Sequence, residues 1–308
     1  MDALSQVLSL LKITQCRGTG LDAGGDWSIH FQSFEGIKFN AVLKGQCWVT
    51  TQDREEPYLV EAGDCILLSR GEPFIAATDL SMTPINSNLV YQDRSKKVAI
   101  WNGGGDFLLV GFSFKFTGDI WQMLTNALPA FILLKNASHQ VSVLNWAIAQ
   151  LSIELKEESL GGELMTNHLA QMMLLQVLRV WLGPEQIRYK GWLAALADHR
   201  LLRSMNAIHA QPNYSWSVAE LAAKAGMSRT SFATHFEKVV GQSPIRYLTY
   251  WRMLLAADLL INGDEKISTI AYRVGYQSEA AFSTAFKRLY NCTPSEYRVK
   301  KRTTLVLP

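Results

Sequence analysis

Histidine and cysteine, the residues that most often bind metals or act as nucleophiles, are scarce in the first part of this chain. His30 is the only histidine before residue 130. One histidine cannot build the two-histidine, one-carboxylate site of a metal-dependent oxygenase. No Ser/His/Asp or Cys/His arrangement is legible either. We therefore expect a protein that is not an enzyme, with no catalytic residues, no metal and no cofactor.

The four cysteines show no pattern of a disulfide or zinc framework. Cys16, Cys47, Cys65 and Cys292 form no CxxC pair and match no zinc-binding spacing. Four reduced thiols in a cytoplasmic protein are the interpretation that this spacing favours.

A repeated pattern in the last third of the chain has the spacing of a binding surface. Residues 217–244 and 266–294 resemble each other, and Ser228, Phe232 and Phe236 match Ser278, Phe282 and Phe286. Phenylalanines at i and i+4 make a buried stripe on a helix. The opposite face of the second-copy helix, residues 278–290, carries mostly short side chains, so this helix is expected to fit closely against a partner surface.

Each copy is expected to fold as a helix-turn-helix motif. A short helix leads to a glycine, Gly226 or Gly275, which can adopt the positive φ of a tight turn, and a serine then caps a second helix. One helix, residues 244–261, joins the copies. An ordinary αα-hairpin is the alternative, but two copies in register favour nucleic-acid binding.

Charge is distributed unevenly along the 308 residues, although the net charge is only +3. Residues 1–196 contain 15 Lys and Arg against 19 Asp and Glu, whereas residues 197–308 contain 15 against 8. A basic C-terminal third joined to an acidic first part predicts a polyanion partner.

Before this basic region, the spacing of apolar residues changes from the pattern of strands to the pattern of helices. Residues 26–130 contain short runs rich in β-branched and aromatic residues, broken by glycines and prolines, which predict a sandwich or barrel. Residues 142–158 and 162–182 have helical patterns. The second is apolar over much of its circumference, which predicts burial in its own domain or in a subunit interface.

No membrane or secretion signal is apparent. The N-terminal "MDALSQVLSLLKI" has no basic region and no small-residue cleavage site, and its apolar residues recur at helical spacing. The longest apolar runs are too short and too interrupted to span a bilayer.

These motifs carry a resemblance to a known family. "WRMLLAADLLI", "ISTIAYRVGYQSEAAFSTAFKRLY" and "TPSEYR" are similar to the linker helix and C-terminal signature of the AraC/XylS family of bacterial transcription regulators. "VLKGQCWV", "LVEAGDCILLSRGEPF" and "GGGDFLLVGFSF" resemble the cupin-like effector domain of one subfamily.

The resemblance implies an α+β multidomain protein. We expect a cupin-like β-barrel with a helical dimerisation segment, followed by an all-α domain with two helix-turn-helix motifs joined by a linker helix. The expected divisions are 1–135 for the effector domain, 136–183 for the helical segment, 184–196 for the linker and 197–308 for the DNA-binding domain.

The family's geometry implies that each second helix enters a major groove. The implied base-facing residues are Arg229, Thr230, Ala233, Thr234, Glu279, Ala280, Ser283 and Thr284. Candidates for phosphate contacts are Ser228, Lys238, Arg246, Arg252, Ser278, Lys287 and Arg298. Arg229 fits a bidentate guanine contact or a phosphate contact, and Glu279 fits a cytosine contact or simple complementation of the helix N-terminus.

Within the barrel, a small-molecule pocket or plain core packing are the alternatives for the aromatic residues. The candidates are Trp27, His30, Phe39, Trp48, Tyr58 and Phe74. A thiol response through Cys16, Cys47 and Cys65 and a cupin enzyme fused to a DNA-binding module are alternative functions.

The favoured function is an effector-responsive transcription regulator, more often an activator in this family. Its expected partners are double-stranded operator DNA, RNA polymerase, an unknown small molecule and a second copy of the chain, with no membrane. The expected location is the cytoplasm, at the nucleoid when DNA is bound.

Overall fold

The computed structural model describes residues 2–52, 54–93, 96, 98–135, 139–157, 159–182 and 190–306. The chain forms two compact units. The barrel unit comprises Ile13–Thr117 and Leu128–Trp181, and the helical unit comprises Met1–Lys12, Gly118–Ala127 and Leu182–Pro308. The helical unit thus includes two segments from the part of the chain that the sequence assigns to the effector domain. Residues 184–189 of the predicted linker 184–196 lie outside the described residues.

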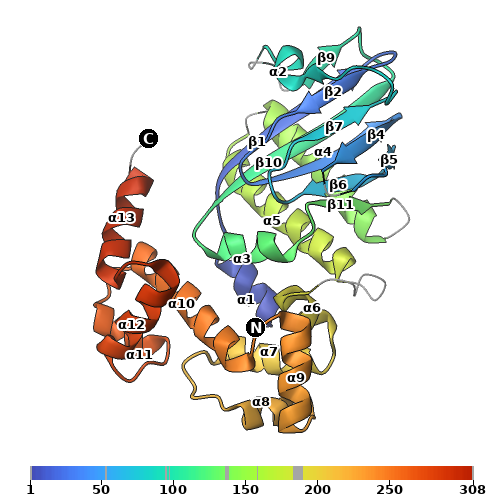
Figure 1. Ribbon diagram of the computed structural model, residues 1–308. Helices are drawn as coiled ribbons and strands as arrows, with labels where there is room; N and C mark the ends of the chain where they lie inside the picture. The colour runs from blue at the N-terminus through green and yellow to red at the C-terminus, as the bar shows by residue number, and fades with distance from the viewer. Residues whose placement is uncertain are drawn as a thin grey trace. The chain divides into compact units, whose positions relative to one another are not determined.

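The described part of the barrel unit is built mainly from strands (Figure 1). These are β1 (Lys12–Ala23), β2 (Ser28–Phe31), β3 (Ile37–Lys44), β4 (Gln46–Thr51), β5 (Tyr58–Glu61), β6 (Cys65–Leu68), β7 (Phe74–Ala77), β8 (Ile85–Asn86), β9 (Val98–Trp101), β10 (Phe107–Thr117) and β11 (Phe131–Leu134). They form a sheet in the order β11-β6-β3-β10-β1-β9 and a second in the order β5-β4-β7-β2-β8. Leu21 and Val42 of the first sheet share a core with Ile29 and Val49 of the second. The predicted β-rich architecture is therefore confirmed.

Strand alternation determines which side chains face this core. In β3, Lys38, Asn40 and Val42 share one face because side chains two residues apart point the same way. Asn40 is paired with Gly111 of β10, and a Cβ on Gly111 would lie 2.0 Å from the Asn40 Oδ1 atom. The glycine is thus required for the polar Asn40 side chain to remain inside the barrel.

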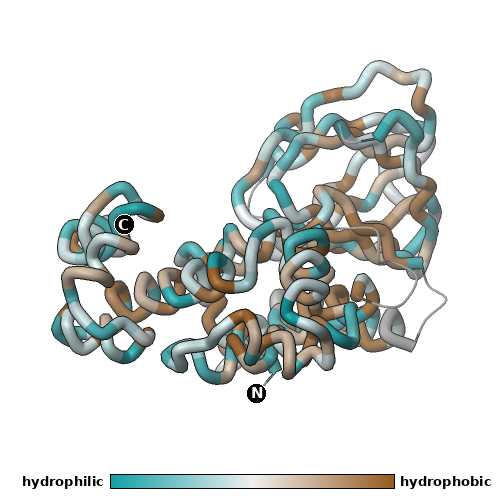
Figure 2. The backbone as a smooth tube through the Cα atoms, turned by 60° about the horizontal axis from the view of Figure 1, so that its bottom comes forward, coloured by the Kyte–Doolittle hydropathy of each residue, from teal (hydrophilic) through white to brown (hydrophobic). Residues whose placement is uncertain are grey.

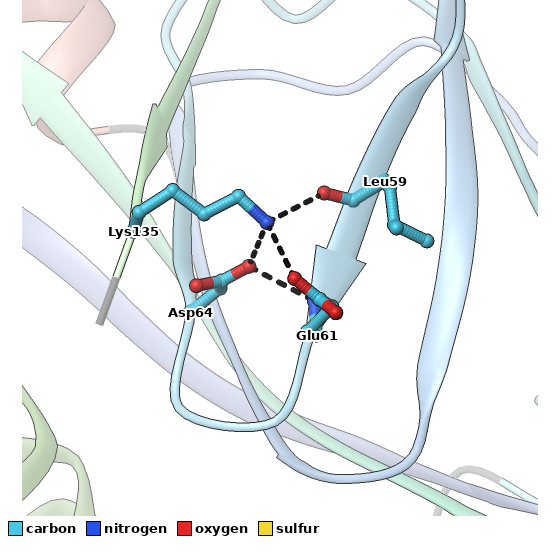
Figure 3. Close-up of polar contacts among 4 residues, drawn as sticks. All are labelled: Leu59, Glu61, Asp64 and Lys135. Atoms are coloured by element: carbon cyan, nitrogen blue, oxygen red, sulfur yellow. Dashed lines mark hydrogen bonds and ion pairs between the residues drawn. The ribbon is translucent and has the colours of Figure 1, made fainter. Parts of the chain in front are cut away.

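A charged cluster fastens β11 to the β5–β6 turn (Figure 3). The Lys135 Nζ atom donates to Asp64 Oδ2 at 2.8 Å, to Glu61 Oε2 at 3.0 Å and to the Leu59 carbonyl oxygen at 3.0 Å. The Asp64 side chain is only 3% exposed, and it also accepts from the Glu61 backbone N–H at 2.9 Å. Burial alone would lower the pKa of Lys135, but the bonds to Asp64 and Glu61 raise it.

Three helices complete the described barrel unit: α2 (Ser87–Val90), α4 (His139–Glu157) and α5 (Gly162–Trp181). The long helices predicted at 142–158 and 162–182 are confirmed. They pack against each other, and α5 also contacts β11. On α4, Leu144, Ile148 and Leu151 are fully buried, whereas Trp146 is 54% exposed.

The described helical unit contains only helices and their connections. They are α1 (Ala3–Ser9), α3 (Ile120–Ala127), α6 (Trp192–Ala197), α7 (Leu201–Ala210), α8 (Val218–Ala225), α9 (Arg229–Val240), α10 (Pro244–Asn262), α11 (Ile267–Arg273), α12 (Glu279–Tyr290) and α13 (Pro294–Val306). Figure 2 shows hydrophilic and hydrophobic colours alternating along these helices, as expected when one face is buried.

The segments α1 and α3 are joined to the other helices of this unit by hydrogen bonds. The Ala3 backbone N–H donates to the Asn206 side chain at 2.9 Å, and the Trp192 indole N–H donates to the Met123 carbonyl oxygen at 3.1 Å. Within the predicted β-rich region 26–130, residues Ile120–Ala127 form the helix α3, and β1 lies at Lys12–Ala23, before the start of that region.

Candidate nucleic-acid interface and barrel cavity

The first helix-turn-helix motif consists of α8 and α9. Ser217 and Glu220 form a capping box at the start of α8, in which each side chain satisfies a backbone N–H of the other. The helix ends at Gly226, whose φ of 67° lies in the left-handed region that favours glycine. The turn thus follows directly from local sequence.

Helix α9 has one buried and one exposed face. The Ser228 hydroxyl accepts from the Ser231 N–H at 3.2 Å and caps the helix. Phe232 and Phe236 are fully buried, with ring centroids 5.5 Å apart. The exposed face carries the implied base-facing set: Arg229, Thr230 and Thr234 are exposed, and Ala233 is half-buried.

The second motif, α11 and α12, repeats this arrangement. Ser278 caps α12 through the Ala281 N–H at 3.2 Å, and Phe282 and Phe286 are fully buried. The implied base-facing residues Glu279, Ala280 and Thr284 are exposed, and Ser283 is half-buried. The Thr284 hydroxyl donates to the Ala280 carbonyl oxygen at 3.0 Å, which leaves its methyl group as the outer apolar surface.

The candidate phosphate-contacting residues fall into two groups. Ser228, Lys238, Arg246, Ser278 and Lys287 are exposed. Arg252 and Arg298 are half-buried, and both already donate to backbone carbonyls. Neither the guanidinium of Arg229 nor that of Arg246 has a hydrogen-bond or ion-pair partner among the described residues.

Arg252 connects the two motifs. Its Nε atom donates to the Pro212 carbonyl oxygen at 2.6 Å and a terminal nitrogen donates to that of Tyr214 at 2.9 Å, both in the loop before α8. Its guanidinium also lies 5.8 Å from the ring centroid of Tyr276, in the turn of the second motif. Burial lowers the pKa of Arg252, in agreement with its partial removal from water.

The same contact explains Gly275. Its φ is 94°, and a Cβ there would lie 2.7 Å from the Asn213 Cα atom. The loop before the first motif therefore touches the turn of the second directly. No local pattern in the sequence indicates a contact between segments so far apart in the chain. Arg288, beside the predicted Lys287, is exposed as well.

A cavity of about 250 Å³ lies inside the barrel unit. Its lining is mostly apolar, with a smaller polar set made of Arg17, Thr19, Lys38, Asn40, Ser87, Tyr91 and Ser113. Of the six aromatic and histidine residues proposed from sequence, Trp27 and Phe74 line it. The Trp27 indole N–H has no hydrogen-bond partner among the described residues.

The other four candidates lie outside the lining. Phe39 and Trp48 alternate with the lining residues Lys38 and Cys47, so strand geometry turns them to the opposite face. Tyr58 stacks on Phe131 at 4.3 Å between ring centroids. The His30 Nδ1 atom is paired with the Gln32 side chain at 3.2 Å.

The cysteines of the barrel unit are poorly placed for thiolate chemistry. Burial raises the pKa of Cys16 and of Cys47 to about 12. Burial, assisted by the nearby Asp64 carboxylate, raises the pKa of Cys65 to about 12 as well. Since the thiolate is the reactive form, these environments disfavour rapid oxidation.

Two further properties concern the described residues only. They contain no cluster of three or more His, Cys, Asp or Glu side chains arranged to hold a metal ion. Their helices include none that is both long enough and apolar enough to cross a bilayer.

Comparison with known proteins gives matches over both units. A family model described as Cupin matches residues 2–183, and one described as Helix-turn-helix domain matches residues 221–300. An AraC-like transcription regulator of Streptomyces antibioticus is 36% identical over 298 residues, which cover 97% of this chain and 98% of that protein.

Two further similarities cover different extents. The RCS-specific HTH-type transcriptional activator RclR of Escherichia coli is 32% identical over 307 residues, 98% of this chain and 99% of that protein. The crystal structure of the DNA-binding domain of AdpA in complex with a target DNA matches with 32% identity and a TM-score of 0.31, over 32% of this chain and 87% of that chain.

Proposed function

The chain belongs to the AraC family of DNA-binding transcription regulators, and on this basis we propose that it activates transcription from operators read by α9 and α12 under the control of a small molecule. The observation that carries the proposal is the pair of capped helices with buried phenylalanine stripes and exposed faces of mostly short side chains. Such faces allow a helix to approach the floor of a major groove.

The connection between the motifs supports simultaneous reading of two grooves. Helix α10 has 19 residues, which corresponds to a length of about 28 Å at 1.5 Å per residue. Successive major grooves on one side of DNA are about 34 Å apart. We infer that one chain contacts two successive grooves, and that its rigid spacing favours bent DNA.

The individual base contacts follow from side-chain chemistry. Arg229, which has no partner among the described residues, is our candidate for a bidentate contact to guanine. The methyl groups of Ala280 and Thr284 suit contacts with thymine methyls. We assign Glu279 to the N-terminus of α12, where a carboxylate complements the helix dipole. The exposed Lys238, Arg246 and Lys287 are proposed to contact phosphates, with the capping Ser228 and Ser278 beside them.

We further propose that the effector occupies the barrel cavity. Its size, its mainly apolar lining and its few polar side chains fit a small-molecule site. Trp27 and Phe74 are the sequence-derived candidates that remain in this role.

We propose that the protein acts as a homodimer through α4 and α5. Trp146 and Ile153, one heptad apart on α4, are 54% and 42% exposed, and Leu164 and Met165 on α5 are 62% and 48% exposed. Exposed apolar side chains gathered on one helix pair mark an interaction surface. Sedimentation equilibrium of the full chain checks this, and a monomer at micromolar concentration would contradict it.

A thiol-based response is the alternative, and the raised pKa values of the barrel cysteines weigh against it. We expect a variant with Cys16, Cys47 and Cys65 all changed to Ser to keep its full response in a promoter-fused reporter. Loss of the response, with normal protein level and DNA binding, would establish the thiol mechanism instead.

The decisive experiment for the proposed function is footprinting of the purified full chain on DNA fragments selected from the genome by binding. Protection of two segments about one helical turn apart is expected. In a reporter fused to the protected site, expression is expected to rise when the bound protein contacts RNA polymerase. Uniform, sequence-independent protection would refute it.

A further inference from the structure

Three polar residues of the cavity lining lie next to one another on neighbouring strands. Lys38 on β3 is paired with Ser113 on β10, and the Ser113 hydroxyl donates to the Arg17 carbonyl oxygen on β1 at 3.4 Å. These strands are neighbours in the order β3-β10-β1, and all three residues line the cavity. A row across three strands therefore carries two cationic side chains and a hydroxyl.

Farther along the same strands the lining becomes apolar. On β3 the lining residues are Lys38, Asn40 and Val42, each two positions after the one before. Val42 is paired with Leu109 of β10. On β1 the lining residues change in the same way, from Arg17 to Thr19 to Leu21. Since side chains two residues apart share a face, the cavity passes from a cationic end to an apolar interior.

The cationic end has no compensating negative charge. No acidic residue occurs among the described residues that line the cavity. Neither Lys38 nor Arg17 forms an ion pair with any described carboxylate; the Lys38 Nζ atom lies instead over the Phe34 ring, 4.2 Å from its centroid. Burial lowers the pKa of Lys38, because the ammonium is partly desolvated without a carboxylate partner. Such a group gains most from an anion placed beside it.

We propose that the cavity binds an organic carboxylate with an apolar body. The carboxylate is held by Lys38 and Arg17, and the apolar body lies against Leu21 and Val42. This inference rests on the proposed function in one respect: it names the chemical class of the effector for the same cavity.

The test compares matched acids and alcohols on the full-length wild-type protein. Octanoate is paired with octan-1-ol and 4-ethylbenzoate with 4-ethylbenzyl alcohol, and each is titrated calorimetrically at neutral pH and low salt. We expect at least one acid to bind at least tenfold more tightly than its alcohol. The proposal is overturned if neither acid binds, or if neither acid binds at least tenfold more tightly than its matched alcohol.

Variants then locate the carboxylate. Lys38→Met is expected to reduce the acid's affinity at least tenfold while leaving the alcohol's affinity within twofold, and Lys38→Arg is expected to restore most of it. The matched control is Lys115→Met, because Lys115 lies on the same strand as Ser113 but is exposed and paired with Glu35 at 2.8 Å. If Lys38→Met fails to fold, Arg17→Gln provides the same comparison. Unchanged acid affinity in the folded variant overturns the proposal.

Failure of this inference and failure of the proposed function give different results. Calorimetry measures ligand binding without DNA, whereas footprinting measures operator binding without ligand. Normal footprints with no preference for acids would overturn the ligand class alone. A clear preference for acids with no sequence-specific footprint would overturn the regulatory function alone.

Discussion

At the scale of single residues, Arg229 is the side chain whose replacement tests the interface most directly. It is exposed at the start of α9, and no described residue pairs with its guanidinium. We expect Arg229→Ala to weaken operator binding by about 1–3 kcal/mol, the usual value of a bidentate base contact. Fluorescence anisotropy titrations at several salt concentrations measure the change.

The companion substitution Arg229→Lys separates base reading from phosphate contact. Lysine keeps the charge but loses the guanidinium fork. If Arg229 contacts guanine, Arg229→Lys should lose most of the discrimination between the operator and a variant with that base pair changed. Retention of both affinity and discrimination by Arg229→Lys would identify a phosphate contact.

Residue roles were predictable from sequence where local rules fix them. The caps at Ser228 and Ser278 and the buried Phe232 and Phe282 follow from spacing along one helix. The cavity lining was not predictable in the same way. Phe39 is as apolar as a pocket residue should be, but a shift of one position along β3 places it on the other face, and aromatic character alone does not reveal strand phase.

At the scale of elements, the ion-pair cluster in Figure 3 provides a stability prediction for the barrel unit. We expect Lys135→Met to lower the free energy of unfolding by about 1–2 kcal/mol, because the buried Asp64 carboxylate loses its cationic partner. The loss is limited because Lys135 itself is 48% exposed, so water screens its charge. Urea unfolding followed by tryptophan fluorescence measures it.

The control for this prediction is Glu61→Gln, which removes the exposed partner and should cost about 0.5 kcal/mol or less. Because the folded-state pKa of Lys135 is raised above its usual value of 10.5, its contribution is complete below that value and is lost as the pH rises past the folded-state pKa. The difference between wild type and Lys135→Met should therefore shrink in strongly alkaline solution. Equal effects of the two substitutions at neutral pH would contradict the assignment.

Arg252 leads to a prediction about the spacing of the two motifs. As a structural link between the loop at Pro212 and the turn at Tyr276, it should keep that spacing fixed. We expect Arg252→Ala to reduce, at least threefold, the affinity ratio between the native operator and one with a base pair inserted between its two half-sites. If Arg252 instead contacts a phosphate, Arg252→Ala should lower the affinities for both operators by the same factor.

Arg246→Ala is the matched control for Arg252→Ala, since Arg246 is exposed on the same helix and has no described partner. It should weaken binding to both operators equally and reduce the salt dependence. An unchanged affinity ratio in Arg252→Ala would show that α10 alone fixes the spacing.

Most helices of the helical unit were predictable because their caps and periodicity are local. β1 and α3 were not, for two physical reasons. Gly18 and Gly20 weaken the strand signal in β1. A Cβ at Gly20 would be a tight fit, 3.2 Å from the Leu109 carbonyl oxygen. α3 has eight residues, and in so short an apolar segment a buried helix and a buried strand look alike.

At the scale of the whole molecule, the chain connects the cavity to the helical unit through two short paths. Strand β1, which carries Arg17, begins just after α1, and strand β10, which carries Ser113, ends just before α3. Within the helical unit, Asp119 at the start of α3 accepts a hydrogen bond from the Tyr297 hydroxyl of α13 and lies 3.4 Å from the Lys301 Nζ atom. Tyr297 in turn packs on Phe286 of the second motif, with ring centroids 5.3 Å apart.

This connection predicts that Asp119 couples the cavity to DNA binding. The carboxylate is the shared partner of two residues on α13, so Asp119→Asn removes its charge while keeping its shape. We expect the reporter's response to the acid that binds the cavity to fall at least fivefold, which corresponds to about 1 kcal/mol of coupling. Ligand affinity and DNA affinity, each measured separately, should remain within twofold of the wild-type values.

Glu35→Gln, which breaks an exposed pair with Lys115, is the control and should leave the response unchanged. A normal response in Asp119→Asn would show that the signal reaches the recognition helices by another path.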